Sequence, residues 1–477
     1  MLMSLQLIYG PSGSGKSYTL YKKIIEQSIR EPDREFIVIV PEQFTMQTQR
    51  ELVELHPNRG ILNIDVQSFL RLAWRIFEEV GVDTHTVLED TGKNLLLRRV
   101  ASRQKNDLTV LGRNFRKPGY ISQVKSIISE LKQYDVSLEE LDEQLRSGKK
   151  DALSYKLQDI RNLYEGFQEE LQGKYITSEE ILEELCYVVK KSEILKGCVV
   201  ALDGFTGFTP IQNKLLRELM QTAEKIYVTV TLDAWEDPMK KVSMHKLSYL
   251  SKKTIQQLAG AAKECGCMLE KPEVLGKEGS IRFRSAPALR FLERHLFRPG
   301  NQIYEAQDSQ KLERELSLHV ARDAKAEAEF AARTIWHLVR EENLRYRDIA
   351  VITGDMESFG DHMKKELQQK GIPCFIDRTR KLLLNPLVEF LRAALQIATK
   401  SFRYESVFRY LRTGLAGLKR DEIDRLENYV LANGINSRRR WEEPWDEQEE
   451  PFKEKILPPL LAFVDQVREK DGTVRQK

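Results

Sequence analysis

Short runs of apolar residues recur along the chain, and amphipathic helical patterns lie between them. Strands that alternate with helices are typical of a parallel sheet covered by helices on both faces. This alternation predicts an α/β domain built from residues 1–81 and 197–270. Its expected strands are Leu5–Tyr9, Phe36–Val40, Leu62–Val66, Val199–Asp203 and Ile226–Leu232.

The long interval between the third and fourth runs differs in character. Residues 82–196 are strongly charged and follow the helical period rather than the strand period. We therefore expect a helical domain inserted into the α/β domain. Its predicted helices are Thr91–Gln104, Ile121–Tyr134, Ala152–Leu171 and Ser178–Lys191.

A second α/β pattern occupies residues 271–400, after an irregular stretch over 271–305. Helices are expected at Asp323–Glu342 and Glu357–Lys370. From residue 401 to 477 only helical patterns remain, which indicates the start of another helical domain. The strands expected in this second α/β domain are Leu316–Val320, Ile349–Thr353 and Pro373–Asp377.

The bulk composition changes this picture little. Of 477 residues, 41% are hydrophobic and 31% charged, and the net charge is +3. The net charge therefore does not indicate nucleic-acid binding, and evidence for it must come from local basic patches. No apolar run reaches the length of a membrane helix. The N-terminus leads directly into a strand, without room for a signal peptide, so we expect a cytoplasmic protein. The five cysteines lack zinc spacing and are interpreted as reduced thiols.

The strongest local signal is the sequence Gly-Pro-Ser-Gly-Ser-Gly-Lys-Ser at residues 10–17, directly after the first predicted strand. Strand, glycine loop and helix in this order predict a P-loop that binds the phosphates of ATP. Lys16 is expected to pair with the β- and γ-phosphates, while Ser17 and Asp203 are expected to hold Mg²⁺. The predicted nucleotide-binding residues are Gly10, Ser12, Gly13, Ser14, Gly15, Lys16, Ser17 and Asp203.

Four stretches in sequence order resemble a known family. The P-loop, Pro41–Thr45, Ser68–Trp74 and Asp203–Pro210 resemble motifs of AddB, one of the two subunits of the bacterial AddAB helicase–nucleases. AddB proteins are built on a UvrD-like superfamily 1 helicase core. The resemblance implies domains 1A (1–81 and 197–270), 1B (82–196), partial 2A (271–400) and the start of 2B (401–477).

The same resemblance implies a function and partners. Proteins of this family belong to an ATP-dependent helicase/exonuclease that acts in double-strand break repair by recombination. An AddB protein works beside an AddA-like helicase–nuclease subunit on single-stranded and duplex DNA, and reads the regulatory sequence Chi. Family members continue into a nuclease domain with a 4Fe-4S cluster. This chain has neither, so we expect it to be an N-terminal fragment.

The residue after Asp203 bears on ATP hydrolysis. Active UvrD-like enzymes place a glutamate there to activate the attacking water, whereas this chain has Gly204. Loss of a general base alone lowers a rate by roughly 10²–10⁴. We therefore expect ATP binding with little or no hydrolysis. Two alternatives stay open: an active superfamily 1 translocase and a P-loop phosphotransferase acting on a small metabolite.

Candidate DNA contacts come from the same resembling stretches. Aromatic side chains offer faces on which unstacked bases can stack, and arginine can fork onto a base edge or a phosphate. Core packing is an equal alternative for Phe69, and Phe208 could instead anchor a turn before an N-cap at Thr209. The predicted DNA-binding residues are Gln43, Thr45, Phe69, Arg71, Trp74 and Phe208.

Two further basic runs are weaker candidates. Arg438–Trp441 is interpreted as a solvated loop rather than a DNA contact. Arg113–Lys117, in the inserted domain, is the better candidate for contact with duplex DNA or a partner subunit.

Overall fold

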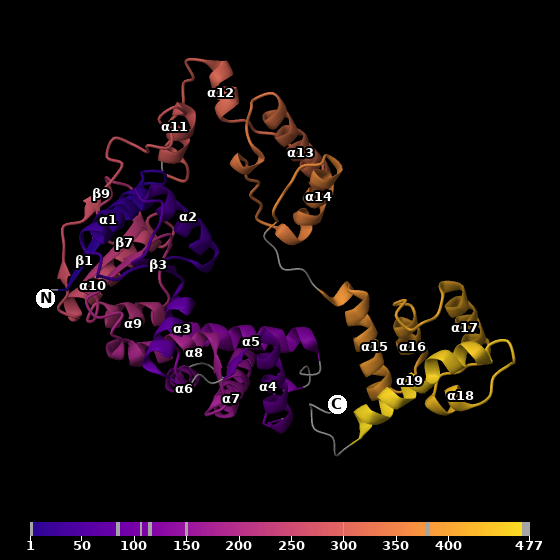
Figure 1. Cartoon of the computed structure of the whole chain (residues 1–477). Helices are drawn as coiled ribbons and strands as arrows, with labels where there is room; N and C mark the ends of the chain where they lie inside the picture. Colours follow the sequence, from indigo (N-terminus) through magenta and orange to yellow (C-terminus); the bar gives the residue numbers. More distant parts are fainter. Residues whose placement is uncertain are drawn as a thin grey trace. The chain divides into compact units, whose positions relative to one another are not determined.

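The structure is a computed structural model that describes residues 3–82, 86–104, 107–112, 117–147, 151–298, 300–376 and 382–469. It divides into two compact units, residues 1–317 and 318–477. Each unit is described by itself (Figure 1).

The first unit is organised around a parallel sheet of seven strands. Five of them, in the order β3-β2-β6-β7-β1, confirm the predicted strands, and β8 and β9 both pair with β1 at the edge. This confirms the α/β class with a parallel P-loop-type sheet. The strands are β1 (Ser4–Gly10), β2 (Phe36–Ile39), β3 (Ile64–Gln67), β6 (Val199–Leu202), β7 (Lys225–Thr231), β8 (Met268–Leu269) and β9 (Glu273–Val274).

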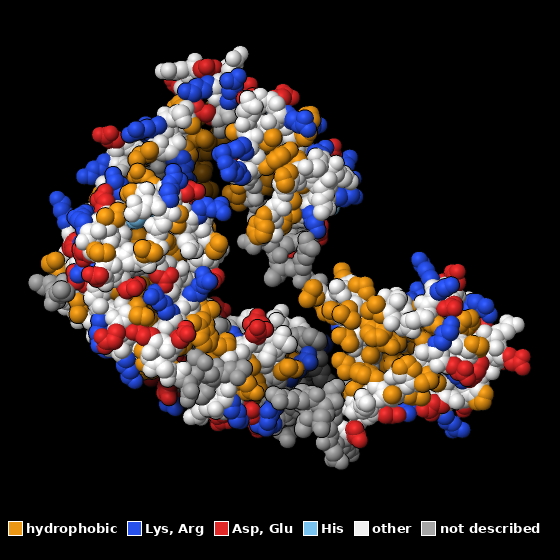
Figure 2. All heavy atoms as spheres, in the orientation of Figure 1, with side chains coloured by type: hydrophobic (Ala, Val, Ile, Leu, Met, Phe, Trp, Pro, Cys, Tyr) orange, Lys and Arg blue, Asp and Glu red, His pale blue; other side chains and the backbone are white. Residues whose placement is uncertain are grey.

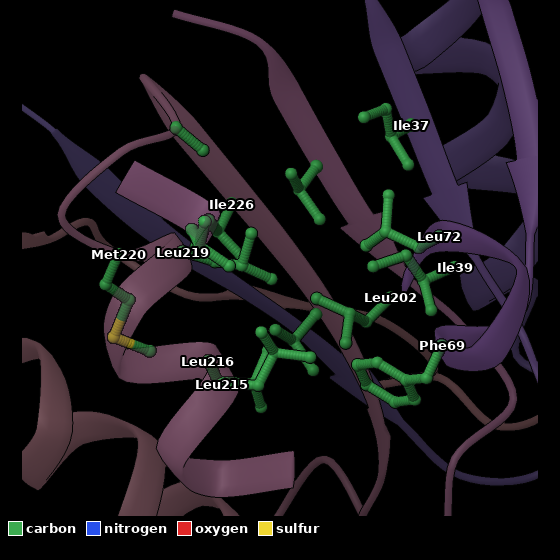
Figure 3. Close-up of a cluster of buried hydrophobic side chains, with 14 of the residues drawn as sticks. Ile37, Ile39, Phe69, Leu72, Leu202, Leu215, Leu216, Leu219, Met220 and Ile226 are labelled. Carbon is green, nitrogen blue, oxygen red and sulfur yellow. The ribbon is translucent and has the colours of Figure 1, made fainter. Parts of the chain in front are cut away.

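Helices cover both faces of this sheet because side chains of a strand alternate between its faces. Ile8 points to the face covered by α1 (Lys16–Arg30) and α2 (Thr45–Leu55). Leu5 and Leu7 point to the other face. That face packs against α3 (Phe69–Val80), α8 (Ser178–Val188), α9 (Pro210–Leu219) and α10 (Tyr249–Glu264), and Figure 3 shows part of this core.

The inserted residues form a helical subdomain with a core of its own. Its members are β4 (Thr86–Leu88), α4 (Asp90–Arg103), α5 (Pro118–Gln133), α6 (Leu138–Ser147), α7 (Ala152–Leu171) and β5 (Tyr175–Thr177). Helix α8 behaves differently, because Ile181 and Leu185 lie in the core beneath the sheet rather than in that of the insertion. The last helix predicted for the insertion therefore packs against one face of the parallel sheet.

Two short helices complete the first unit: α11 (Pro287–His295) and α12 (Ser309–Glu315). Between β9 and α11 the chain passes close to the P-loop, as described below. Within the described residues, no helix is both long and apolar enough to cross a membrane.

The second unit is helical in the residues that the structure describes. The two helices predicted near its start are present, and further helices follow, as expected from the sequence. The helices are α13 (Ala324–Arg340), α14 (Met356–Gln369), α15 (Pro386–Lys400), α16 (Tyr404–Leu411), α17 (Arg420–Ala432), α18 (Arg438–Glu442) and α19 (Glu450–Arg468).

The three strands predicted in the second α/β domain do not form among the described residues. The runs 316–320, 349–353 and 373–376 pass α13 and α14 without strand pairing, and Asp377 lies outside the described residues. Val320 is 95% exposed and Ile352 93% exposed. A β-strand is stabilised by backbone hydrogen bonds to a neighbouring strand, so an apolar run of the right composition does not become a strand without one.

The run Arg438–Trp441 is helical rather than a solvated loop. It forms α18, in which Trp441 is buried in the core of the second unit. Arg438 pairs with Asp465 and Glu442. The indole of Trp441 is therefore a packing group in the core of the second unit. The other basic run, Arg113–Lys117, lies outside the described residues except for Lys117.

A large apolar surface lies along α15. Leu387, Leu391 and Leu395 recur every four residues and are about half exposed, as Figure 2 shows by the hydrophobic side chains gathered over this helix. Residues four apart share one face of a helix, so these leucines form a continuous stripe.

Candidate nucleotide and nucleic-acid sites

The P-loop joins the end of β1 to the start of α1. Gly13 and Gly15 have φ angles of 73° and 89°, in the left-handed region that glycine adopts without strain. Gly15 is the N-cap of α1, so the positive end of the helix faces the loop. Ser12 is exposed, Ser17 is half-buried, and Ser14 is buried without a hydrogen-bond partner for its hydroxyl among the described residues. This arrangement fits an anion such as a phosphate.

The ammonium group of Lys16 folds back onto the loop. It donates hydrogen bonds to the carbonyl oxygens of Gly10, at 3.1 Å, and Pro11, at 2.9 Å. Burial lowers the pKa of Lys16, although the nearby carboxylate of Asp203 acts in the opposite direction. A phosphate entering the loop would add negative charge beside this half-buried cation.

The segment after β9 forms a second wall of the loop, which the sequence analysis missed. The backbone N–H of Arg282 donates to the carbonyl oxygen of Gly13 at 3.2 Å. A Cβ on Gly13 would lie 2.6 Å from the Ser280 hydroxyl oxygen, so only glycine permits this approach. The Ser280 hydroxyl is buried and has no partner among the described residues. The positive charge of Arg282 lowers the pKa of Lys16 further. Two cations and two unsatisfied hydroxyls therefore meet at this loop.

Asp203 follows β6 and is buried near Lys16. Its carboxylate accepts hydrogen bonds from the hydroxyl of Tyr21, at 2.7 Å, and from that of Thr229, at 2.5 Å. Neutral donors thus satisfy a charge that would be costly to bury alone. The carboxylate has the chemistry to contact the hydration shell of Mg²⁺, which prefers oxygen ligands.

Gly204 adopts a left-handed conformation, with a φ angle of 78°. A Cβ at this position would lie 3.5 Å from Cδ of Pro41, an ordinary contact. Space is therefore available, but the backbone conformation is one that other residues adopt only at a cost. The backbone is suited to glycine at the position where an active UvrD-like enzyme would carry its glutamate.

Two of the six predicted DNA-binding residues are buried. Phe69 is 6% exposed and packs against Phe205 and Phe208, with ring centroids 5.4 and 6.4 Å away. Figure 3 shows its ring among the buried side chains of the sheet core. Thr45 is also buried and donates to the carbonyl oxygen of Glu42 at 3.0 Å. In this structure both side chains serve packing and local geometry, and the core interpretation of Phe69 is favoured.

Gln43 and Arg71 are exposed, and Phe208 is half-buried. Phe208 lines a groove of about 930 Å³ beside α9 and α10. We call it the basic groove because Lys214, Arg217 and Lys253 line it, together with Tyr134 and the acidic Asp135 and Glu264. Rings and cations in one groove suit a single strand, whose bases stack and whose phosphates are negatively charged.

Trp74 lies elsewhere. It is half-buried, packs edge-on against Phe77 with centroids 5.9 Å apart, and lines a different groove of about 750 Å³. Five glutamates line this second groove. The structure therefore does not bring Trp74 together with Phe208, and it surrounds the indole with charges that repel phosphates.

Comparison with known proteins decides the family. The family described as ADDB, N-terminal matches residues 7–293. The chain belongs to this AddB family. It is 46% identical over 449 residues to the B subunit of the ATP-dependent helicase/deoxyribonuclease of Lachnoclostridium phytofermentans, covering 93% of this chain and 38% of that protein. It is 34% identical over 476 residues to the protein of the same name from Clostridium novyi, covering 98% and 41%. The chain spans about two fifths of these relatives.

The AddB-family match includes every candidate position described above, from the P-loop to Arg282. Sequence analysis missed Ser280, Arg282 and the cations of the basic groove. The signal available for the first two was a pair of glycines, Gly276 and Gly279, after the apolar run at β9. Lys214, Arg217 and Lys253 gave no such signal, because isolated cations on helices are common on protein surfaces.

The cysteines Cys186 and Cys198 are buried in the first unit. Burial raises the pKa of Cys186 to about 11 and that of Cys198 to about 12. Thiols with such values are inert near neutral pH. In the part of the chain that the structure describes, no group of three or more His, Cys, Asp or Glu side chains could hold a metal ion.

Proposed function

We propose that this chain is the helicase-like part of one subunit of a helicase/deoxyribonuclease. In this role it binds ATP with Mg²⁺, hydrolyses little or none of it, and reads single-stranded DNA of the Chi type during repair of double-strand breaks by recombination. The observation that carries the proposal is Gly204 in a left-handed conformation directly after Asp203, within a P-loop fold of the AddB family. Its partner would be an AddA-like motor subunit.

The nucleotide would be held by the chain's own groups at the P-loop. Backbone N–H groups of residues 13–17 would surround the phosphates, and Lys16 would exchange its two carbonyl contacts for phosphate oxygens. Arg282 and Ser280 would cover the phosphates from the second wall. Ser17 and Asp203 would hold Mg²⁺, whose bound form neutralises phosphate charge. Without a glutamate at position 204, no side chain there activates a water.

Single-stranded DNA would contact the basic groove and the exposed side chains Gln43 and Arg71. Phe208 and Tyr134 offer faces for bases, while Lys214, Arg217 and Lys253 offer charges for phosphates. Because a non-motor subunit moves with its partner, such a reader would need no energy from its own nucleotide site. Bound ATP would then support the fold around the P-loop.

The proposal is tested by measuring binding and hydrolysis in the same tubes. Labelled single-stranded oligonucleotides of varied sequence are titrated with and without ATP and Mg²⁺ at fixed salt, while phosphate release is followed. Sequence-dependent binding without phosphate release is expected. Lys16→Ala should remove ATP binding and leave DNA binding intact. Phosphate release that rises with DNA and disappears in Lys16→Ala would support an active translocase instead.

The phosphotransferase alternative makes a different prediction. It requires transfer of phosphate to a small metabolite in the absence of DNA. Such transfer, abolished by Lys16→Ala, would replace the proposal. If a well-folded chain that still binds ATP shows no DNA binding and no phosphate transfer, the proposal that it reads DNA is refuted.

A further inference from the structure

The groove around Trp74 has an apolar floor and an acidic rim. It lies between α3, α7, β5 and α8 of the first unit, and we call it the acidic groove. Phe77, Leu171 and Ile176 are among its apolar residues. Its five carboxylates are Glu165, Glu169, Glu180, Glu183 and Glu184, and its partly exposed rings are Trp74, Tyr175 and Tyr187. A concave site of about 750 Å³ is large enough to enclose several side chains of a ligand.

Cations of the fold balance only part of this charge. Glu165 pairs with Arg161 at 2.5 Å, Glu180 pairs with Lys132, and Glu183 lies 3.9 Å from Lys214. Glu169 and Glu184 are both exposed. In the residues described, no basic side chain pairs with either of them. The rim therefore keeps an excess of negative charge that is available to a ligand.

The spacing of these carboxylates is unfavourable to the helices that carry them. Glu165 and Glu169 are four residues apart on α7, and Glu180 and Glu184 are four apart on α8. Like charges at this spacing repel one another and destabilise a helix. The stability of the fold thus gives no reason for the second glutamate of each pair.

The rings add a second feature that favours cations. Tyr187 is 63% exposed, and the ammonium group of Lys214 already lies 5.8 Å from the centre of its ring. The indole of Trp74 is the aromatic group that attracts cations most strongly. Carboxylates and aromatic faces in one groove together form a site for lysine or arginine side chains. Phosphates would be repelled, so DNA does not fit here.

We propose that the acidic groove binds a lysine- and arginine-bearing segment of a partner protein. Its cations would pair with Glu169 and Glu184 and lie over Trp74 and Tyr187, while its apolar side chains would cover the floor. This proposal is independent of nucleotide binding and of DNA reading. The acidic groove adjoins the basic groove, because Lys214 lines the basic groove and also lies against Glu183 and Tyr187 of the acidic one.

The test uses fluorescence anisotropy with this chain and a labelled helical peptide that bears arginine and lysine on one face. A matched peptide has glutamine at those positions. The basic peptide should bind and the glutamine peptide should not. Glu169→Lys with Glu184→Lys should weaken binding by about tenfold or more, because close charge pairs are replaced by repulsion. Both glutamates are exposed, so the fold should be retained.

A matched control carries the same change in net charge elsewhere. Glu54→Lys with Glu313→Lys changes two exposed glutamates of the same unit outside the groove. This control should bind the basic peptide nearly as well as the unmodified chain. If both double variants lose the same affinity for the basic peptide, net charge alone explains the loss and the proposal is overturned. Equal binding of the glutamine peptide, or no binding of the basic one, would also overturn it.

A third variant checks for the other class of partner. Tyr175→Ala removes a half-buried ring that lines the acidic groove and not the basic one, so it should weaken binding of the basic peptide without changing the affinity of a single-stranded oligonucleotide. If the oligonucleotide loses affinity and the peptide does not, the groove holds nucleic acid and the proposal is wrong. Urea unfolding of each variant confirms that it remains folded.

Discussion

The hydroxyl of Tyr21 donates a 2.7 Å hydrogen bond to the carboxylate of Asp203. Tyr21 lies on the helix that follows the P-loop, and Asp203 follows a strand near the middle of the sheet. The bond therefore fixes the acid expected at Mg²⁺ relative to the loop expected at the phosphates. Both side chains are buried, so solvent offers no substitute donor.

Tyr21→Phe should lower the free energy of unfolding by about 1–3 kcal/mol, because it leaves a buried carboxylate with one donor fewer. Urea denaturation measures the change. Tyr18→Phe is the matched control, since Tyr18 is on the same helix and is 57% exposed. Equal stability of the two variants would mean that the bond contributes little.

The same phenol predicts a pH dependence at the alkaline end. Burial and the charge of Asp203 raise the pKa of Tyr21 above its usual value of about 10. Above pH 10 the unfolded chain loses this proton first, so the native state binds more protons and stability falls as the pH rises. Between about pH 8 and pH 11, Tyr21→Phe should lose less stability than the unmodified chain. Parallel curves would contradict this.

Gly204→Ala should destabilise the protein by about 1–2 kcal/mol, because a left-handed backbone is unfavourable for residues with a Cβ. Gly260→Ala is the control. Gly260 lies within α10 and has open space around it. Gly260→Ala should therefore leave the free energy of unfolding unchanged or raise it by up to about 1 kcal/mol. Gly204→Glu should show little gain in phosphate release, measured with ATP and DNA, because the left-handed backbone at this position strains any residue that replaces glycine. A gain would show that glutamate alone restores hydrolysis.

Lys93→Met should lower the free energy of unfolding by about 3–5 kcal/mol, because it removes the cation paired with the buried carboxylate of Glu179. The ion pair is 2.8 Å long, and the two side chains are 4% and 9% exposed. An exposed pair, Lys190 with Glu218 at 2.9 Å, supplies the control. Lys190→Met should change stability by about 0–1 kcal/mol. Urea unfolding at neutral pH measures both changes.

The pair of Lys93 and Glu179 also predicts a dependence on acid. Burial alone would raise the pKa of Glu179, but the hydrogen bonds and charge of Lys93, together with hydrogen bonds from its own backbone N–H and from Ser129, outweigh burial and lower the pKa below about 4.5. The stability from this carboxylate is present above that pH and is lost as the pH falls. The deficit of Lys93→Met should therefore be smaller at about pH 4 than at about pH 7. An unchanged deficit would exclude titration of Glu179 as its source.

If Arg71 contacts a phosphate, Arg71→Ala should weaken binding of single-stranded DNA about equally for all sequences. The slope of log affinity against log salt concentration should then fall in magnitude by about one. If Arg71 reads a base, one sequence position should lose its preference instead. Arg30→Ala, at the far end of α1 with a side chain 70% exposed, is the control. No change in either quantity would remove Arg71 from the DNA contacts.

Local chemistry explains which elements sequence could predict. The P-loop and the buried strands are encoded by neighbouring residues, and so is the N-cap at Thr209, whose hydroxyl oxygen accepts from the N–H of Gln212. Long-range contacts are not encoded locally. Phe69 lies in the core because Phe205 and Phe208, distant in the sequence, pack against it. The second wall of the P-loop is formed by Ser280 and Arg282, which are also distant in the sequence. The apolar runs of the second unit fit strands locally but have no partner strand among the described residues.

The position of β1 in the sheet has a consequence for synthesis of the protein. Strand β1 is translated well before β7, β8 and β9, the three strands with which it pairs. The strands β2 and β3 can pair as soon as both have emerged, and the inserted helices can pack on their own core. The apolar β1 must wait until β7 has been translated. During that interval its apolar side chains lack the sheet that buries them in the folded protein, and such exposed surface makes a folding chain prone to aggregate.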